Sequence, residues 1–211
     1  MKQFNPNQEQ IGRLFDVLRA SAEQLGLGFT AEIPPLKSGV RELRNIFLAS
    51  NYSPPWMYRY LDNGYYRIDP VIQMVPFCDI TVDWEEISSM QREFFAEAAG
   101  FGLKTGVAIP LHVPGYTYVV CFADKQDAPV TPALRSQLEG LSFVFLQTWM
   151  REIMPRFDVR HLSPKVLQTV RYALIGCSVS EISDRLGIRR ITVERHLRLA
   201  TGTQGAAKLP V

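Results

Sequence analysis

Residues 52–70 read YSPPWMYRYLDNGYYRIDP and contain the clearest local structural signals of the chain. Ser53 is a favourable N-cap, and the two prolines after it suit the first positions of a helix, where no backbone donor is needed. The Asn-Gly pair that follows ends the helix. Trp56 and Tyr60 are four residues apart, so we expect both side chains on one helical face.

The carboxylate of Asp69 has two interpretations. It can cap a following helix over residues 70–75, PVIQMV, with Pro70 at the first helical position, and on spacing alone this is favoured. Alternatively, it is a buried acid that needs hydrogen-bond donors, and a ligand amide N–H is one such donor. An indole and a phenol can each donate to a carbonyl. A small headgroup with two carbonyls around an amide would therefore fit Trp56, Asp69 and a nearby phenol.

Composition places the chain among ordinary globular proteins of one or two domains. It has 211 residues, of which 46% are hydrophobic and 21% charged. No apolar run is long enough to span a membrane, the first residues are too polar for a signal peptide, and three separated cysteines suggest a reducing compartment. We expect a cytoplasmic protein without membrane contact. The scattered cysteines and histidines form no catalytic or metal-binding motif, so we expect neither an enzyme nor a cofactor.

Residues 1–155 alternate between helical and β-rich patterns. Apolar periodicity predicts helices, and runs of β-branched and aromatic residues predict strands. Helices are expected at 8–26, 91–102 and 132–153, strands at 27–33, 80–84, 106–113 and 116–124, a turn at Pro114-Gly115, and either type at 40–50. In the last helix the predicted inward side chains are Leu134, Leu138, Leu141, Phe145, Leu146 and Trp149. The expected fold is α+β, an α-β-α sandwich.

Residues 156–161 are predicted to be a linker, and residues 162–211 a small all-α domain. Residues 156–211 carry ten basic and four acidic side chains, a charge of +6 that leaves −4 for the remainder. This asymmetry favours a polyanionic partner, although a solvated basic face is the simpler alternative. Helices at 164–176, 178–187 and 189–200, with a capping box from Ser178 to Glu181, match a helix-turn-helix pattern. Val193 and Leu197 should face inward. The predicted DNA-contacting residues are Arg190, Thr192, Glu194, Arg195 and Arg198.

Together, the two parts resemble the LuxR-type quorum-sensing regulators, which join an acyl-homoserine-lactone-binding domain to a helix-turn-helix domain. In the first part the resemblance is carried by Trp56, Tyr60, Asp69, Pro70, Trp84 and Gly106, within WMYRY, RIDPVI, DWEE and GLKTGVAIPLH. In the second part it is carried by LSP at 162–164, by residues 176–188 and by TVERHLR at 192–198.

The resemblance implies a ligand-binding role for six residues and makes this the favoured interpretation of Asp69. Trp56 would donate to the lactone carbonyl, Tyr52 to the acyl carbonyl, and Asp69 would accept the amide N–H. Tyr60 and Trp84 would line the cavity. Cys121 stands where the family often has Ser or Thr, and its weaker thiol donor would hold a polar acyl substituent less firmly. Gly106 would serve packing or a turn.

The C-terminal part departs from the family pattern at several positions. These are Val166, Cys177, Arg189, Glu194 and Leu199. The tail TGTQGAAKLPV is also too short and glycine-rich for the family's final dimerising helix. The sequence therefore predicts a truncated helix-turn-helix with weak DNA binding.

The leading functional hypothesis is a regulator that binds an N-acyl-homoserine lactone and acts on transcription through DNA as a homodimer. The alternative is a DNA-binding-defective antagonist that forms a heterodimer with a full-length relative. The proposed partner surface is the helix at 132–153, because Phe143, Phe145 and Trp149 are too many aromatics to bury on one face.

Overall fold

A computed structural model describes residues 16–33, 46–113, 116–153, 162–174 and 177–200. The contacts between residues divide the chain into two compact units. One unit is Leu18–Leu146, and the other combines Met1–Val17 with Gln147–Val211. No helix in the described ranges is both long and apolar enough to cross a lipid bilayer.

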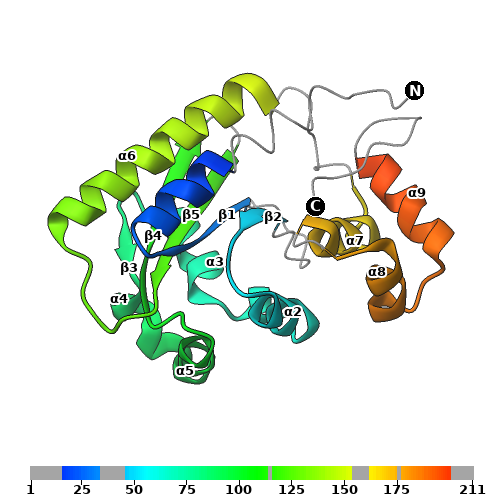
Figure 1. The fold of residues 1–211 in the computed structure, drawn as a ribbon, viewed down its shortest axis with the longest axis horizontal. Helices are drawn as coiled ribbons and strands as arrows, with labels where there is room; N and C mark the ends of the chain where they lie inside the picture. Colours follow the sequence, from blue (N-terminus) through cyan, green and yellow to red (C-terminus); the bar gives the residue numbers. More distant parts are fainter. Residues whose placement is uncertain (1–15, 34–45, 114–115, 154–161, 175–176, 201–211) are drawn as a thin grey trace. The chain divides into compact units, whose positions relative to one another are not determined.

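The unit Leu18–Leu146 is built on a five-stranded antiparallel sheet in the order β2-β1-β5-β4-β3 (Figure 1). The strands are β1 (Gly28–Ile33), β2 (Ile46–Ser50), β3 (Val82–Asp83), β4 (Thr105–Val113) and β5 (Tyr116–Asp124). Strands β4 and β5 pair along their whole length, from Thr105 opposite Asp124 to Val113 opposite Tyr116. The predicted Pro114-Gly115 turn lies outside the described residues. The α+β class is confirmed, and the ambiguous segment 40–50 contains a strand.

Helices lie on both sides of this sheet (Figure 1). The helical residues 16–24 and α6 (Pro132–Thr148) lie on one side. On the other side are α2 (Pro54–Asp62), α3 (Pro70–Met74), α4 (Trp84–Ser88) and α5 (Arg92–Gly100), with short 3-10 turns at Tyr65–Arg67, Val75–Phe77 and Ser89–Gln91. The layered arrangement expected from the sequence is therefore present.

Two local predictions around α2 and β3 need correction. Ser53 occupies the N-cap position of α2, but its side chain makes no capping hydrogen bond. Pro55 at the second helical position removes one of the two backbone donors that a cap can satisfy, and the other is the N–H of Trp56. Trp84 begins α4 instead of ending a strand, so β3 has only two residues. The predicted stop of α2 is confirmed, with Asn63 as its C-cap and Gly64 at φ 65°.

Helix α6 buries only part of its apolar surface. Leu138, Phe145, Leu146 and Trp149 are buried as predicted, whereas Leu134 and Leu141 are half-buried. After Thr148 the helix widens into a π-helical turn, Trp149–Ile153. Phe143 and its neighbour Val144 are 56% and 60% exposed. The expectation that this helix carries more aromatic surface than it can bury therefore holds for Phe143 and not for Phe145 or Trp149.

The other unit contains α7 (Pro164–Leu174), α8 (Val179–Leu186) and α9 (Arg190–Ala200). The capping box is confirmed, because the Ser178 hydroxyl accepts from the Glu181 N–H and the Glu181 carboxylate accepts from the Ser178 N–H. Gly187 ends α8 in the left-handed region at φ 61°, as the sequence predicts. The predicted linker at 156–161 and the tail at 201–211 lie outside the described residues.

The inward face of α9 differs from the prediction at one position. Val193 is fully buried, but Leu197 is half-buried and His196 is buried instead. The Thr169 hydroxyl donates to the Lys165 carbonyl, so it can accept from the Nδ1–H of His196 at 2.8 Å. Burial lowers the pKa of His196, with the charges of Arg195 and Lys165 acting in the same direction. A neutral histidine can therefore serve as a core residue here.

Candidate functional site

Small side chains form the floor of a pocket on the central strands. Because successive residues of a strand point to opposite faces, the strand register sorts the side chains into two sets. Thr30 of β1 pairs with Cys121 of β5, which pairs with Ala108 of β4. Two residues along each strand, and so on the same face, Gly28 pairs with Ala123, which pairs with Gly106. These six small residues leave space above one face of the sheet.

The opposite face carries large side chains from the same strands. Phe29, Val107, Val120 and Phe122 are at most 1% exposed and alternate with the small residues. Both faces are thus buried, which explains why the strands read as nearly continuous apolar runs in the sequence. The division into a small-residue face and a large-residue face places the free space between the sheet and helices α2 to α5.

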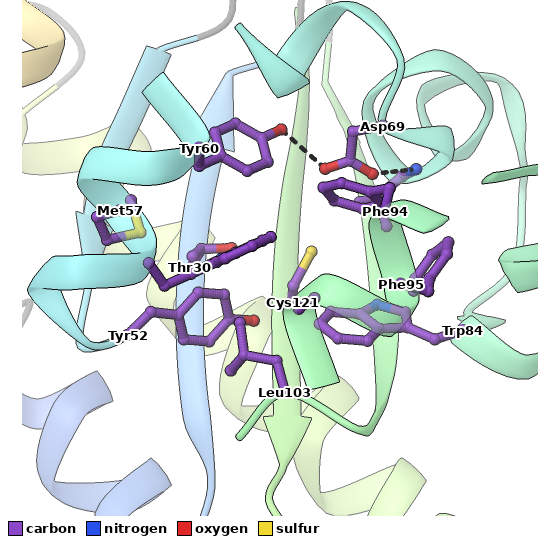
Figure 2. A pocket seen from close by; sticks show the side chains of 13 residues that line it. Thr30, Tyr52, Met57, Tyr60, Asp69, Trp84, Phe94, Phe95, Leu103 and Cys121 are labelled. Atoms are coloured by element: carbon purple, nitrogen blue, oxygen red, sulfur yellow. Dashed lines mark hydrogen bonds between the residues drawn. The ribbon is translucent and has the colours of Figure 1, made fainter. Parts of the chain in front are cut away.

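Figure 2 shows the side chains that surround this space. They are Thr30, Tyr52, Trp56, Met57, Tyr60, Asp69, Val71, Trp84, Phe94, Phe95, Ala98, Leu103 and Cys121. All six residues that the sequence singled out for ligand binding are in this set. Sequence reasoning missed the other seven, which come from β1, α2, α3, α5 and the segment after α5. Their ligand-binding roles, like those of the first six, stay predictions.

Asp69 is the N-cap of α3 and is also buried, whereas its binding of a ligand amide stays a prediction. Its Oδ1 accepts from the backbone N–H of Val71 at 2.9 Å and so caps α3, while its Oδ2 accepts from the Tyr60 hydroxyl at 2.8 Å. The residue is 6% exposed and lines the pocket (Figure 2). Burial raises the pKa of Asp69 to about 6, although both hydrogen bonds act to lower it. The pocket therefore contains a carboxylate that is short of solvation.

The ring of Tyr52 packs directly against the backbone of Gly28. A Cβ atom at Gly28 would lie 2.9 Å from the Tyr52 ring, closer than such contacts allow. The Tyr52 backbone N–H donates to the Ser50 hydroxyl at 3.1 Å, which fixes the chain where it leaves β2. A side chain at position 28 would push the ring out of place, so Gly28 is part of the construction of the site.

An aromatic cluster surrounds Trp56. The centroid of its ring lies 5.9 Å from that of Tyr60, 6.0 Å from that of Tyr65, 5.8 Å from that of Phe94 and 5.3 Å from that of Phe101. These separations are typical of favourable aromatic pairs, which are worth about 0.5–1.5 kcal/mol each beyond their buried area. The cluster joins α2 to α5 through side chains and holds Trp56 and Tyr60 on the pocket side.

A polar link joins the same two helices nearer to the surface. The carboxylate of Glu97 in α5 accepts hydrogen bonds from the Arg59 guanidinium of α2 and from the Tyr65 hydroxyl. The hydrogen bond from Tyr65, together with the neighbouring Arg59, lowers the pKa of Glu97. Since Arg59 is exposed, solvent screens this ion pair and its effect on stability is small.

The free volume of the pocket is about 30 Å³. This is enough for a water molecule, whereas pockets that hold small ligands measure roughly 300–1,000 Å³. A ligand must therefore displace the surrounding side chains. A second cleft of about 570 Å³ borders the pocket and shares Trp84 and Phe95 with it. Within the described ranges, no cluster of three or more His, Cys, Asp or Glu side chains could hold a metal ion.

The predicted DNA-contacting residues lie on or beside α9. Arg190, Glu194, Arg195 and Arg198 are exposed, whereas Thr192 is half-buried. One guanidinium nitrogen of Arg190 donates to the Ser180 hydroxyl of α8 at 2.7 Å. The departures at Val166 and Cys177 are buried among α7 to α9, and those at Arg189, Glu194 and Leu199 are exposed. The exposed side of α9 therefore mixes basic, acidic and apolar groups.

Comparison with known proteins finds a matching family, related sequences and solved structures of similar fold. The sequence profile of the autoinducer binding domain family matches residues 11–148. The transcriptional activator protein TraR of Rhizobium radiobacter is 24% identical over 74% of this chain and 72% of its own length. The quorum sensing-dependent transcriptional regulator RpaR of Rhodopseudomonas palustris is 28% identical over 81% of this chain and 73% of its own. Among solved structures, Escherichia coli SdiA superposes with a TM-score of 0.58 at 18% identity, covering 92% of this chain and 86% of SdiA, which shows similarity of fold alone.

Proposed function

Because the chain belongs to the autoinducer binding domain family of LuxR-type quorum-sensing regulators, we propose that its pocket binds an N-acyl-homoserine lactone and thereby regulates transcription. The observation that carries the proposal is Asp69, a buried carboxylate that lines an otherwise largely apolar pocket. A buried carboxylate gains from each additional hydrogen-bond donor. The amide N–H of the lactone headgroup is such a donor.

The neighbouring side chains complement the rest of the headgroup. Trp56 carries an indole N–H that can only donate, and we assign it to the lactone carbonyl. Tyr52 carries a phenol that can donate to the acyl carbonyl. Together with Asp69 they supply two donors and one acceptor, which matches two carbonyls and one amide. The apolar groups of α5 and β5 would then surround the acyl chain. In this role the protein is a binding protein and not an enzyme.

The binding claim is tested by thermal denaturation with a panel of N-acyl-homoserine lactones of different chain lengths. A ligand that binds only the folded state raises the melting temperature, by an amount that grows with its concentration. We expect at least one lactone to produce such a shift. No shift across the panel, with lactones at millimolar concentration, would overturn the proposal.

We propose that residues 1–155 form the ligand-binding domain and that residues 162–211, after a linker at 156–161, form a helix-turn-helix domain. Support comes from α8 and α9, which are joined across Gly187, and from the basic side chains of α9. Arg195 and Arg198 would contact phosphates, which supplies affinity without sequence information. Glu194, which directly precedes Arg195 and is exposed, opposes that contact. We therefore expect DNA binding that is weak and poorly selective.

This expectation is tested by the salt dependence of DNA binding. The affinity of the full chain should fall steeply with salt and differ little between promoter and random DNA. Replacing both Arg195 and Arg198 by alanine should reduce the slope of log affinity against log salt by about two. The matched control is Arg92→Ala, which removes an exposed arginine of α5 and should leave the slope unchanged. A tight, sequence-selective footprint at physiological salt would contradict this assignment.

We propose that the chain dimerises through α6. Phe143 and Val144 form an adjoining pair of exposed apolar side chains on this helix, and such surfaces commonly mark interfaces. The same surface would serve a homodimer or a mixed dimer with a full-length relative.

The dimer is tested by sedimentation of the lactone-bound protein. Phe143→Glu should shift it from dimer to monomer, because a buried unpaired charge at an interface is costly. Ile80, which is 75% exposed elsewhere in the same unit, provides the control Ile80→Glu, expected to leave the dimer intact. If the wild type is a monomer, or if both variants behave alike, α6 is not the interface.

A further inference from the structure

We infer that Tyr65, which lies outside the pocket lining, is a positioning residue that holds Trp56 and Asp69 in the arrangement the ligand headgroup requires. The inference rests on the proposed function, in which these two residues bind the headgroup. Its starting observation is that the ring, the backbone carbonyl and the hydroxyl of Tyr65 each make a separate contact around the pocket. Since Tyr65 is not among the pocket-lining residues, a substitution there removes no contact with a ligand in the pocket.

The ring of Tyr65 packs against two rings that line the pocket. Its centroid lies 6.0 Å from that of Trp56 and 6.1 Å from that of Tyr60, which it meets edge to face at 86°. Phe94 of α5 is the third neighbour, with centroids 5.5 Å apart. Tyr65 is half-buried, whereas the other three residues are buried. Because close packing restricts side chains to few rotamers, the Tyr65 ring limits how far Trp56 and Tyr60 can move.

The backbone of Tyr65 holds Asp69 in addition. Gly64, at φ 65°, lets the chain turn after α2 into the 3-10 turn that Tyr65 begins. There the Tyr65 carbonyl accepts from the N–H of Asp69 at 2.9 Å. The Asp69 carboxylate accepts from the hydroxyl of Tyr60, whose ring Tyr65 contacts (Figure 2). Tyr65 therefore holds Asp69 directly through its backbone and indirectly through its ring.

The hydroxyl of Tyr65 anchors the ring itself. It donates to one carboxylate oxygen of Glu97 in α5, and the other oxygen accepts from the Arg59 guanidinium of α2. A hydrogen bond to a charged acceptor is about twice as strong as one between neutral groups. The ring cannot swing away from its neighbours without losing this bond, so Glu97 fixes Tyr65 and Tyr65 fixes the pocket residues.

The size of the pocket makes this support important for binding. The free volume is about 30 Å³, so a ligand enters only by displacing side chains. Trp56 and Asp69 have to keep their relative position during this change, because they are assigned to different atoms of one small headgroup. A residue that holds both of them reduces the conformational freedom that is lost on binding.

The inference is tested by titration calorimetry of the full chain with N-hexanoyl-, N-octanoyl- and N-dodecanoyl-homoserine lactone. Tyr65→Phe keeps the ring and removes the anchoring hydroxyl, so the affinity should fall about threefold to tenfold, the cost of ordering one or two side chains on binding. The factor should be similar for every probe that binds, because the headgroup is common to all three. Glu97→Ala removes the acceptor of the same bond and should reproduce the loss, and the double variant should add little to it.

Arg59→Ala is the matched control for the link between α2 and α5. It removes the other donor to Glu97 but leaves the Tyr65 hydroxyl in place. Because the guanidinium is exposed and its ion pair is weak, the affinity should stay within about twofold of the wild type.

A double-mutant cycle separates positioning from a general contribution to the fold. If Tyr65 acts through Trp56, the Tyr65→Phe substitution should cost clearly less affinity in a Trp56→Phe background than in the wild type. A residue that only stabilises the fold would give the same factor in both backgrounds.

Three results would overturn the inference. They are an affinity of Tyr65→Phe equal to that of the wild type, equal losses in Tyr65→Phe and Arg59→Ala, and an undiminished loss in the Trp56→Phe background. Each of them requires that the wild type binds a lactone, so the proposed function would stand. Absence of binding by every probe would contradict the proposed function itself.

Discussion

Asp69→Asn is expected to weaken lactone binding by roughly tenfold to a hundredfold, the largest effect of any single polar substitution in the pocket. In the wild-type protein, the Val71 N–H and the Tyr60 hydroxyl already donate to the two carboxylate oxygens. The ligand amide adds a third donor. An asparagine has only one side-chain oxygen, so at least one of these donors must face an NH₂ group.

The substitution can be distinguished from simple loss of the fold. Asparagine is as good an N-cap as aspartate, so the start of α3 should survive and the melting temperature of the free protein should change little. Calorimetry with one lactone gives the affinity ratio. Tyr60→Phe is the companion variant, since it removes one donor to Asp69 and should have the smaller effect. An affinity within twofold of wild type for Asp69→Asn would show that the carboxylate does not hold the ligand.

Lactone binding is also expected to weaken at acidic pH. The pKa of Asp69 in the free protein is raised to about 6 by burial, and the ligand amide requires the ionised form as its acceptor. Below that pKa a proton must leave before the ligand binds, so the affinity should fall about tenfold per pH unit and be about tenfold weaker at about pH 5 than at about pH 7. Calorimetry over this range should show a flat profile for Asp69→Asn. A flat profile in the wild type would contradict the role of Asp69.

The folding stability of the ligand-free protein should change with pH in the opposite direction to the lactone affinity, because of the same carboxyl group of Asp69. The folded-state pKa of about 6 exceeds the ordinary value of 3.8, so between these values the unfolded state binds fewer protons. The stability of the fold then decreases as pH rises from 3.8 towards 6, as far as Asp69 alone contributes. Ligand binding reverses this cost, because the added donor stabilises the ionised carboxylate.

Local chemistry in the sequence predicted the boundaries of the elements around Asp69, whereas Tyr52, Trp84 and Cys121 were singled out only through the family resemblance. Prolines at the start of α2, the Asn-Gly pair at its end and the Asp-Pro pair before α3 each act within a few residues. Such signals survive folding because neighbours in the chain remain neighbours in space. The same reasoning correctly identified the capping box of α8 and the left-handed Gly187.

The floor and the far side of the pocket could not be predicted in this way. Strand β5 is buried on both faces, so its apolar run alone gives no indication that Cys121 faces the cavity, and Cys121 was singled out only through the resemblance. Only the register with β1 and β4 reveals a row of small residues. Phe94 and Phe95 likewise reach the pocket through the packing of α5, which depends on the tertiary fold. The alternation of small and large residues along these strands was the one signal in the sequence from which the pocket floor could have been predicted.

The C-terminal departures illustrate a different limit. Val166 and Cys177 differ from the family pattern, yet both are buried among α7 to α9, where an apolar side chain is favourable. Glu194 and Leu199 differ on the exposed side of α9, where a DNA-contacting group would stand. The sequence alone does not distinguish these two kinds of departure. In the structure, the buried ones belong to the core and the exposed ones alter the proposed DNA-binding surface.

The central claim, that the pocket holds an acyl-homoserine lactone through Asp69, is tested most directly by mass spectrometry of co-purified ligand. Wild type and Asp69→Asn would be expressed in parallel in a host supplied with a mixture of lactones, then purified and extracted. The expected result is one or a few lactones recovered in near-stoichiometric amount from the wild type and far less from the variant. Recovery of no lactone from folded wild-type protein, or of equal amounts from both proteins, would contradict the account.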